Sequence, residues 1–297
     1  MSRRLLWAHL AIFGANIIYG LNYSIAKEVM PNHIAPFGFI FCRVLGALSL
    51  FWLFFSFGKS EKIKAKDLAL MAVCGLFGVA GNQLMFFYGL NLTSPINAAI
   101  IMTSNPILVL IMSALIIKER ITPTKIIGIF LGLAGAVGLI LHGHHLSITK
   151  DTALGDLFIF LNASSYAIYL VLVKPLMQRY KPTTVIKWVF LFGFIIVIPF
   201  GYQDFAAIEW QNFSPAIWGA FLFVVLGTTF LAYLFNIYGL KNLSPTVVST
   251  YIYAQPMIAT LIALLMKQDQ LDWIKISAAL AIFAAVYLVS IRKPKRI

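Results

Sequence analysis

The chain has 297 residues, of which 61% are hydrophobic and only 11% are charged. A soluble domain usually carries about a quarter charged residues, so this composition excludes an ordinary soluble protein and indicates a polytopic membrane protein. The formal net charge of +13 does not indicate a nucleic-acid partner, because the basic residues lie in short connections between long apolar segments.

Ten apolar segments follow one another along the chain, each with about 20 residues, which is enough for a helix to cross the bilayer core. The apolar runs are continuous rather than alternating, which predicts helices and argues against membrane-spanning strands. We therefore predict an all-α membrane protein with ten transmembrane helices and short connections. The predicted spans are residues 5–27, 36–57, 67–91, 95–117, 123–142, 154–177, 182–202, 213–240, 245–266 and 272–291.

The distribution of basic residues predicts the orientation in the membrane. With the N-terminus placed in the cytoplasm, eighteen lysines and arginines fall in cytoplasmic segments and four fall in segments on the opposite side. Basic residues are enriched on the cytoplasmic side of membrane proteins. The pattern therefore predicts a multi-pass protein of the inner (plasma) membrane with both termini in the cytoplasm.

One motif occurs twice, half a chain apart. Tyr-Gly-Leu followed by Ser-Pro occupies residues 88–95 and leads to Pro106, and the same pattern occupies residues 238–245 and leads to Pro256, at a constant offset of 150 residues. Because five helices, an odd number, separate the copies, they must cross the membrane in opposite directions. Inverted repeats are typical of secondary transporters, whose substrate site lies between the repeats near mid-membrane. The predicted repeats are residues 1–145, with spans one to five, and residues 146–297, with spans six to ten.

The same motif carries a resemblance to a known family, together with Ile116-Ile-Lys-Glu-Arg-Ile121, Gly155-Asp156 and Gly227-Thr228. Along essentially its whole length the chain resembles the EamA-type transporters of the drug/metabolite transporter superfamily. The resemblance implies a transporter rather than an enzyme. Its implied substrates are amino acids, cofactors, sugar-linked metabolites or drugs, among which the motifs do not choose.

The prolines of the motif predict irregular helices. In each copy the serine can cap the helix that the next proline opens. Pro106 and Pro256 fall in the middle of predicted spans, where a proline removes a hydrogen bond and kinks the helix. The neighbouring Asn105 and Gln255 could satisfy the freed carbonyls. Two interpretations stay open: a flexible, polar gate in a cavity wall, or a structural kink packed against a neighbour.

Polar side chains gather on spans one, three, four, six, eight and nine. Such groups need partners in lipid, so these faces should point into the bundle. Helix–helix hydrogen bonding explains any one of them as well as substrate contact does, but together they match the spans that line the cavity of the resembled family. The predicted substrate-binding residues are Asn16, Tyr19, Tyr23, Asn82, Gln83, Asn105, Asn162, Tyr166, Tyr169, Tyr233, Tyr253 and Gln255.

Arg43 is the only strongly charged residue well inside a span. It is interpreted either as the binding group for a carboxylate or phosphate, or as a structural cation satisfied by the carbonyls of a kinked neighbour. All ten acidic residues fall in loops or at span ends, so the chain departs from the small multidrug members of the superfamily, which use a buried glutamate. Facilitated diffusion, exchange and other forms of coupling stay open.

The leading interpretation is a secondary transporter that moves a small organic metabolite, an amino acid or related compound by resemblance, by alternating access and in the export direction. The alternatives are a membrane-embedded transferase and a lipid-handling accessory subunit. We expect no cofactor. We also expect no metal site, because apart from Asp151 no Cys or carboxylate completes a ligand set around the histidines of one outside loop. A glycine face on span five indicates close helix packing or a homodimer contact. The histidines of the loop are His142, His144 and His145, and the glycines of span five are Gly128, Gly132 and Gly135.

Overall fold

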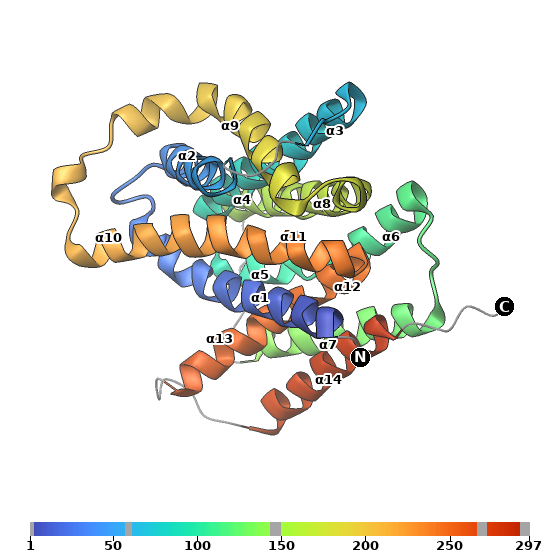
Figure 1. The fold of residues 1–297 in the computed structure, drawn as a ribbon. Helices are drawn as coiled ribbons and strands as arrows, with labels where there is room; N and C mark the ends of the chain where they lie inside the picture. The colour runs from blue at the N-terminus through green and yellow to red at the C-terminus, as the bar shows by residue number, and fades with distance from the viewer. Residues whose placement is uncertain (1–2, 57–60, 143–149, 266–271, 292–297) are drawn as a thin grey trace.

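The computed structural model describes residues 3–56, 61–142, 150–265 and 272–291. These residues form helices and no strands, which confirms the all-α prediction, and helices occur at all ten predicted spans (Figure 1). In chain order the elements are α1 (Arg3–Val29); α2 (Pro36–Phe55); α3 (Ala65–Gly75), η1 (Leu76–Ala80) and α4 (Gly81–Leu92); α5 (Pro95–Met102) and α6 (Asn105–Ile117); α7 (Pro123–Leu141); α8 (Lys150–Arg179); α9 (Pro182–Ala206); η2 (Trp210–Asn212); α10 (Pro215–Leu222), η3 (Phe223–Leu231) and α11 (Ala232–Asn242); α12 (Pro245–Thr250), η4 (Tyr251–Tyr253) and α13 (Ala254–Leu265); and α14 (Trp273–Ser290).

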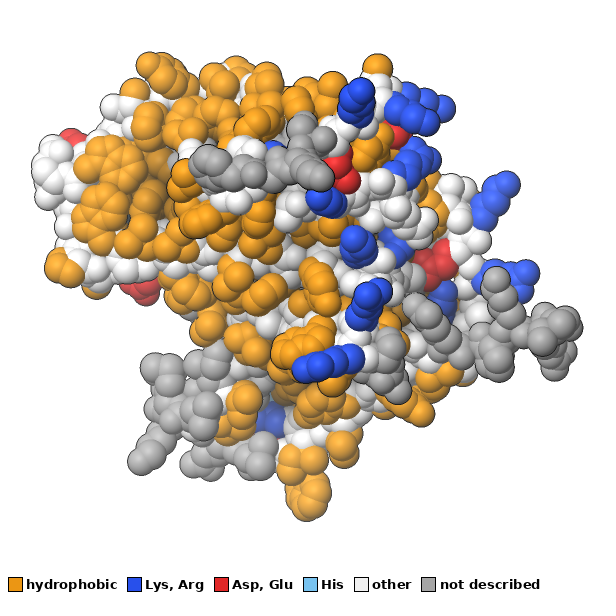
Figure 2. All heavy atoms as spheres, in the orientation of Figure 1, with side chains coloured by type: hydrophobic (Ala, Val, Ile, Leu, Met, Phe, Trp, Pro, Cys, Tyr) orange, Lys and Arg blue, Asp and Glu red, His pale blue; other side chains and the backbone are white. Residues whose placement is uncertain are grey.

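The surface of the described part of the chain is that of a membrane protein. Nine of its helical stretches are long and apolar enough to cross a bilayer, and the span from α12 to α13 is divided into shorter pieces. Large apolar side chains such as Leu115 and Phe283 are well exposed, as expected for residues that face lipid. On the face drawn in Figure 2, hydrophobic side chains cover most of the molecule, whereas lysines and arginines gather mainly at one end.

The helices of the two predicted repeats pack in matched pairs. In the first pairing α1 lies against α11, and α8 lies against α4. Likewise, α1 packs on α13 of the second repeat, and α8 packs on α6 of the first. In addition, α2 packs on α9, and α7 packs on α14. Close crossings depend on glycine: a side chain at Gly75 of α3 would meet the backbone of α9 at Val189 and Gly193. The core is therefore built between the two sequence halves rather than within each.

Spans three and eight each contain a π-helical segment, η1 and η3. A π-helical turn shifts the backbone hydrogen bonds and leaves carbonyl groups open to other donors. In η1 the Phe77 carbonyl accepts from Ser165 Oγ of α8 at 2.7 Å, and the Gly78 carbonyl accepts from Tyr233 Oη of α11 at 2.8 Å. Spans six and eight are thus joined to span three where its helix is irregular.

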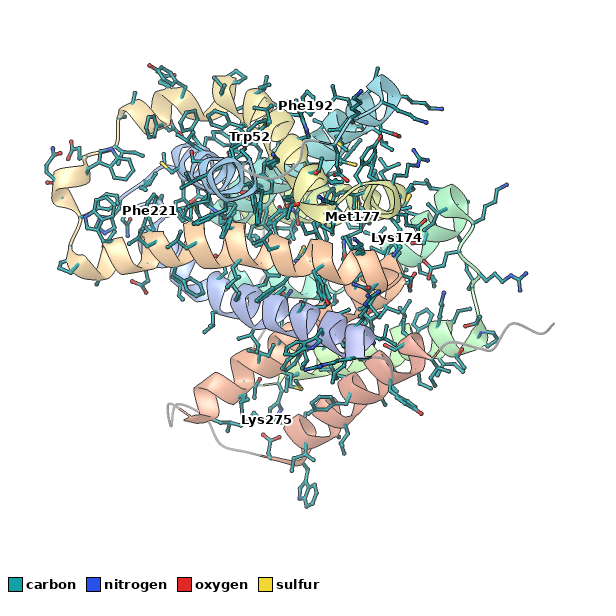
Figure 3. The ribbon with its side chains drawn as sticks, viewed as in Figure 1. Trp52, Lys174, Met177, Phe192, Phe221 and Lys275 are labelled. Carbon is teal, nitrogen blue, oxygen red and sulfur yellow. The ribbon has the colours of Figure 1, made fainter. Side chains whose placement is uncertain are left out.

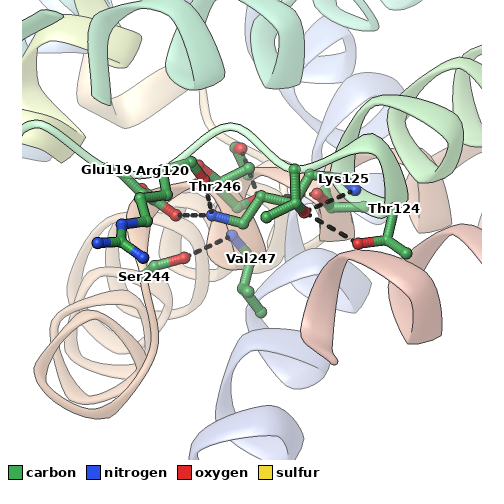
Figure 4. Close-up of polar contacts among 10 residues, drawn as sticks. Glu119, Arg120, Thr124, Lys125, Ser244, Thr246 and Val247 are labelled. Carbon is green, nitrogen blue, oxygen red and sulfur yellow. Dashed lines mark hydrogen bonds and ion pairs between the residues drawn. The ribbon is translucent and has the colours of Figure 1, made fainter. Parts of the chain in front are cut away.

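The predicted helix caps of the repeated motif are confirmed. The Ser94 hydroxyl accepts from the Asn97 amide at 3.0 Å, and the Ser244 hydroxyl accepts from the Val247 amide at 3.4 Å. The Ser244 cap lies beside the connection between α6 and α7, where Lys125 Nζ pairs with Glu119 at 2.7 Å and donates to the Arg120 carbonyl at 3.0 Å (Figure 4). The cap is therefore packed against an ordered ion pair.

The regular α-helix is interrupted just before Pro106 and Pro256, the positions at which kinks were predicted. The helix α5 ends at Met102 and α6 begins at Asn105, so Pro106 lies in the first turn of a new helix. Pro256 likewise lies in the first turn of α13, after the 3-10 turn η4. A proline is favourable there because the first amides of a helix have no partner within the helix. Each span is thus divided into two α-helical segments beside its proline.

The amides beside these prolines, which were candidates for satisfying the freed carbonyls, bond to neighbouring spans. Asn105 Nδ2 donates to the Ala163 carbonyl of α8 at 2.7 Å, and Gln255 Nε2 donates to Asn16 Oδ1 of α1 at 2.9 Å. Because the chain breaks into a new helix, these side chains are free to bond neighbouring spans. They connect the broken spans to the first helix of each predicted repeat.

Asp272 caps α14 and joins it to the end of α7. Its Oδ1 accepts from the Lys275 amide at 2.9 Å, and its Oδ2 accepts from Lys275 Nζ at 2.8 Å and from His142 Nε2 at 2.7 Å. The bonds from Lys275, followed by those from His142, hold the pKa of the Asp272 carboxyl well below its usual range. The carboxylate therefore favours the folded state while it is ionised.

This linkage predicts a pH-dependent effect of Asp272→Asn. The stabilising contribution of a carboxyl with a lowered folded-state pKa is fully present above its unfolded pKa of about 3.9 and is lost as the pH falls through the folded-state value. The melting temperature of the variant should therefore lie below that of the unaltered chain at pH 7, and the difference should shrink below about pH 4. Thermal unfolding in detergent over this pH range measures the difference in melting temperature between the two proteins. A difference that does not change with pH would contradict the linkage.

Candidate functional site

A polar cavity lies between spans one, two, three, four, six, eight and nine. It contains about 760 Å³ of space between protein atoms, with the open space at its mouth included. The predicted substrate-binding residues that line it are Asn16, Tyr19, Asn82, Gln83, Asn162, Tyr166, Tyr233 and Gln255, and Arg43 lines it with them. Residues from both sequence halves therefore meet around one space.

Three other predicted residues lie in the surrounding packing. Asn105 is fully buried and bonds to α8. Tyr169 lies against Gly78, where the ring occupies the place of a side chain, and Tyr253 lies in the same way against Gly132. The polar pattern could not separate these positions from the cavity wall, because adjacent faces of one helix differ by only part of a turn. The side chain of Tyr23 lies outside the described residues.

The cavity wall also includes residues that the polar pattern did not select. Asn22 and Asn236 are polar and lie one turn from predicted residues, so the helical spacing did carry a signal for them. The apolar ones could not be distinguished from the many apolar residues that face lipid. The additional lining residues are Asn22, Phe86, Phe87, Met102, Thr228, Asn236, Val248 and Ile252.

Hydrogen bonds across the cavity wall tie α1 to the second half of the chain. Asn236 Nδ2 donates to Tyr19 Oη at 3.0 Å, and Thr228 Oγ1 donates to Asn22 Oδ1 at 3.1 Å. With the bond from Gln255 to Asn16, these contacts join α1 to η3, α11 and α13. Polar groups in a membrane interior require such partners, so the wall is held by the side chains that also face the cavity.

Arg43 enters the cavity wall from α2 and is 3% exposed. Its Nε donates to Thr229 Oγ1 at 3.0 Å, and Thr229 in turn donates to the Val224 carbonyl of η3 at 2.9 Å. The guanidinium carbon lies 4.3 Å from the centre of the Phe87 ring, a cation–π distance. Arg43 Nη1 is buried and has no hydrogen-bond partner, so the surrounding groups satisfy only part of the guanidinium.

Two amide side chains of the wall retain unused hydrogen-bonding atoms. Asn162 donates through Nδ2 to the Asn82 carbonyl at 2.7 Å, and its Oδ1 has no partner. Gln83 lies near the Tyr233 hydroxyl, but neither atom of its amide makes a hydrogen bond of normal geometry. Buried polar atoms without partners are uncommon in folded proteins. The wall of the cavity therefore contains buried polar atoms whose hydrogen-bonding capacity is not used.

The histidine loop and the glycine face can now be placed. His142 bonds to Asp272, whereas His144 and His145 lie outside the described residues. Within the described ranges, no group of three or more His, Cys, Asp or Glu side chains could hold a metal ion. The glycine face of span five is covered within the chain, since it packs on α14 and on Tyr253. A homodimer contact through these glycines is therefore not supported.

Comparison with known proteins identifies the family. The model of the EamA-like transporter family matches residues 6–141 and again residues 153–291. The chain belongs to the EamA-like transporter family. An uncharacterized transporter from Archaeoglobus fulgidus is 26% identical to this EamA-like chain over 289 residues, which cover 97% of it and 95% of the relative. The uncharacterized transporter YyaM of Bacillus subtilis is 27% identical over 260 residues, 86% of this chain and 84% of the relative.

The fold of this EamA-like transporter also matches a solved one. A crystal structure with 18% sequence identity superposes with a TM-score of 0.76, covering 95% of this chain and 96% of the other. At this identity the match concerns the fold alone. With the apolar helices described above, the family membership establishes a multi-pass membrane transporter.

Proposed function

We propose that this EamA-like protein is a secondary transporter that moves a small organic metabolite by alternating access, in the export direction across the inner (plasma) membrane. By family resemblance, an amino acid or a related compound is the first substrate class to examine. The observation that carries the proposal is the central polar cavity, whose wall combines residues of both halves and retains unpaired polar atoms. A site between two repeats is the usual arrangement in such transporters.

The contacts of α8 support an inverted relation between residues 1–145 and 146–297. Near the start of α8, the Asp156 carboxylate accepts from Thr93 Oγ1 at 2.5 Å and from Asn97 Nδ2 at 3.3 Å, at the first Ser-Pro junction. Near its end, Lys174 donates to the carbonyls of Leu240 and Leu243 at the second junction (Figure 3).

These two anchoring residues are eighteen positions apart on one helix. A helix rises 1.5 Å per residue, so the two junctions are separated by about 27 Å along α8, close to the thickness of the bilayer core. The Ser-Pro motifs thus fit opposite sides of the membrane, as two copies of opposite direction would require.

The orientation with cytoplasmic termini fits the place of the counted basic residues on the folded protein. The basic side chains that gather at one end in Figure 2 lie around the start of α3, the connection between α6 and α7, and the N-terminal end of α1. All three belong to segments that the distribution of lysines and arginines assigns to the cytoplasm. We propose that this end faces the cytoplasm.

Flux through reconstituted protein tests the proposal. Full-length protein in liposomes of known orientation is loaded with labelled amino acids and related organic acids, and release is compared with that from protein-free liposomes. Release that is saturable, and that is accelerated by unlabelled compound on the opposite side, is the expected result for alternating access. Folded and oriented protein that moves none of the compounds would count against the function.

A further inference from the structure

Among the described residues that line the cavity, there is one positive charge and no carboxylate. Arg43 is the only cationic residue of this described lining, and none of these residues is Asp or Glu. Ion pairs elsewhere in the described part of the chain lie in the connections and at helix ends, as for Glu119 with Lys125 and Asp67 with Arg179. A buried charge without a counter-charge is costly in apolar surroundings. The cavity is therefore electrostatically incomplete when it is empty.

The guanidinium is held in a fixed orientation. The bond from Arg43 Nε to Thr229 holds one edge of the group, and the face of the Phe87 ring lies 4.3 Å from its central carbon. Both contacts leave Nη1 unpartnered. An arginine presents its donors in a planar fork that matches a carboxylate, and a fork that is already oriented loses less entropy on binding. The geometry thus suits a planar anionic group.

Charge balance selects among the possible ligands. A monocarboxylate would neutralise the one cation, whereas a phosphate dianion would leave a negative charge in the cavity. A zwitterionic amino acid would bring an ammonium group for which the wall offers no carboxylate, and a simple cation would be repelled. Since uncompensated buried charge is unfavourable, the most complementary ligand carries a single negative charge.

The other residues of the cavity wall indicate the chemistry of the part of the ligand that does not contact Arg43. The rings of Phe86, Phe87 and Tyr166 line the same space, and aromatic surfaces of this kind favour a planar apolar body. The amide side chains of Gln83 and Asn162 also belong to this wall, and Asn162 Oδ1 has no hydrogen-bond partner within the protein. An apolar compound with one negatively charged end would contact Arg43 through that end and the aromatic rings through its apolar body.

We propose that the substrate of this transporter is an organic monocarboxylate with an aromatic or otherwise apolar body, and that Arg43 binds its carboxylate. The inference rests on the proposed transport function, and it replaces the amino acid that family resemblance put first with an organic monoanion. It makes Arg43 a substrate-binding residue rather than a purely structural cation.

A series of ligands that differ mainly in charge tests the proposal on full-length protein in detergent. The probes are 3-phenylpropionate, its neutral amide, L-phenylalanine, 3-phenylpropylamine and phenyl phosphate, and the measurement is the dissociation constant by calorimetric titration. The carboxylate should bind at least about tenfold more tightly than each of the others, because only it completes the charge of the cavity. Equal binding of the amide or of L-phenylalanine, tighter binding of the phosphate, or no binding of the carboxylate would overturn the inference.

Variants assign the selectivity to Arg43. Arg43→Gln should weaken the binding of 3-phenylpropionate by about tenfold or more and leave that of the neutral amide little changed, and Arg43→Lys should lie between. The matched control is Lys187→Gln, which removes a cation that also lies over an aromatic ring, 4.8 Å from Trp52, but does not line the cavity. If Arg43→Gln does not fold, the binding constants of the charge series on the unaltered chain still test whether the cavity selects a monocarboxylate.

Failure of this inference can be distinguished from failure of the transport function. Charge-selective binding without flux of 3-phenylpropionate in liposomes would support the anion site and count against transport. Saturable flux of L-phenylalanine that is unaffected by Arg43→Gln would support transport and overturn the anion site. Retained carboxylate selectivity in folded Arg43→Gln would remove Arg43 from its proposed role.

Discussion

Replacing Met102 by Trp is expected to reduce substrate flux by about tenfold or more, the effect of a loss of about 1.4 kcal/mol in substrate binding. Met102 is the last residue of α5, and its side chain lines the cavity directly before the break that precedes Asn105. A tryptophan there can extend into the empty space and occupy volume that a ligand needs. Because the added ring fills a cavity rather than overfilling a packed core, the folded yield should change little.

The matched control for this prediction is Ile111→Trp. Ile111 lies on the next helix, α6, in the same span, and it is 46% exposed on the outer surface. The same aromatic side chain at that position would contact lipid, so flux should remain close to normal. Flux in liposomes, normalised to folded protein, compares the two variants. Normal transport by Met102→Trp would show that the substrate does not pass through this cavity.

Replacing Gly75 by Leu is expected to prevent normal folding. A Cβ atom at Gly75 would lie 2.8 Å from both the Val189 carbonyl oxygen and the Gly193 amide nitrogen of α9. Both are backbone atoms, so α3 and α9 would have to separate, whereas a flexible side chain could have moved aside. Overpacking of a well-packed core typically costs about 1–3 kcal/mol, and forced separation of two helices should reach the upper part of that range. The yield of monodisperse protein and its melting temperature measure the effect.

Gly138→Leu provides the corresponding control on α7. A Cβ atom at Gly138 would have no other heavy atom within 4 Å apart from its own helix backbone and chain neighbours. The substitution should leave the yield unchanged and could raise the melting temperature, since glycine in a helix is less favourable than alanine by about 0.5–1 kcal/mol. Similar losses in both variants would indicate a general intolerance of larger residues rather than the close contact at Gly75.

Much of the architecture could be predicted because its causes are local along the chain. Continuous apolar runs of membrane length predict helices whatever their neighbours, and all ten predicted spans contain helices in the structure. The caps at Ser94 and Ser244 also depend only on residues three positions away. The prolines show the limit of this reasoning, since a proline inside an apolar run is compatible with either a bend or a complete break. Contacts such as that of Asn105 with Ala163 accompany the break.

The candidate site could be predicted only in part. Polar residues inside spans are few, so most of those selected do line the cavity, and Asn16 and Gln255 even bond to each other. The aromatic residues were harder to place, because a tyrosine can face a cavity or fill the space above a glycine. Tyr166 does the first and Tyr169, three residues later, does the second. Phe87 carried no signal at all, although it contacts the buried guanidinium of Arg43.

The sequence alone determined that this protein is helical, lies in a membrane and repeats a motif five spans apart, because composition, hydrophobic length and spacing are properties of the chain itself. The tertiary structure decided which polar faces meet, and it brought Arg43 to Thr229 and Phe87 without a carboxylate beside it. Apolar side chains look alike along a sequence whether they face lipid, a neighbouring helix or a cavity. Only the packing of distant spans distinguishes these environments, and that packing formed the cavity around one incompletely paired arginine.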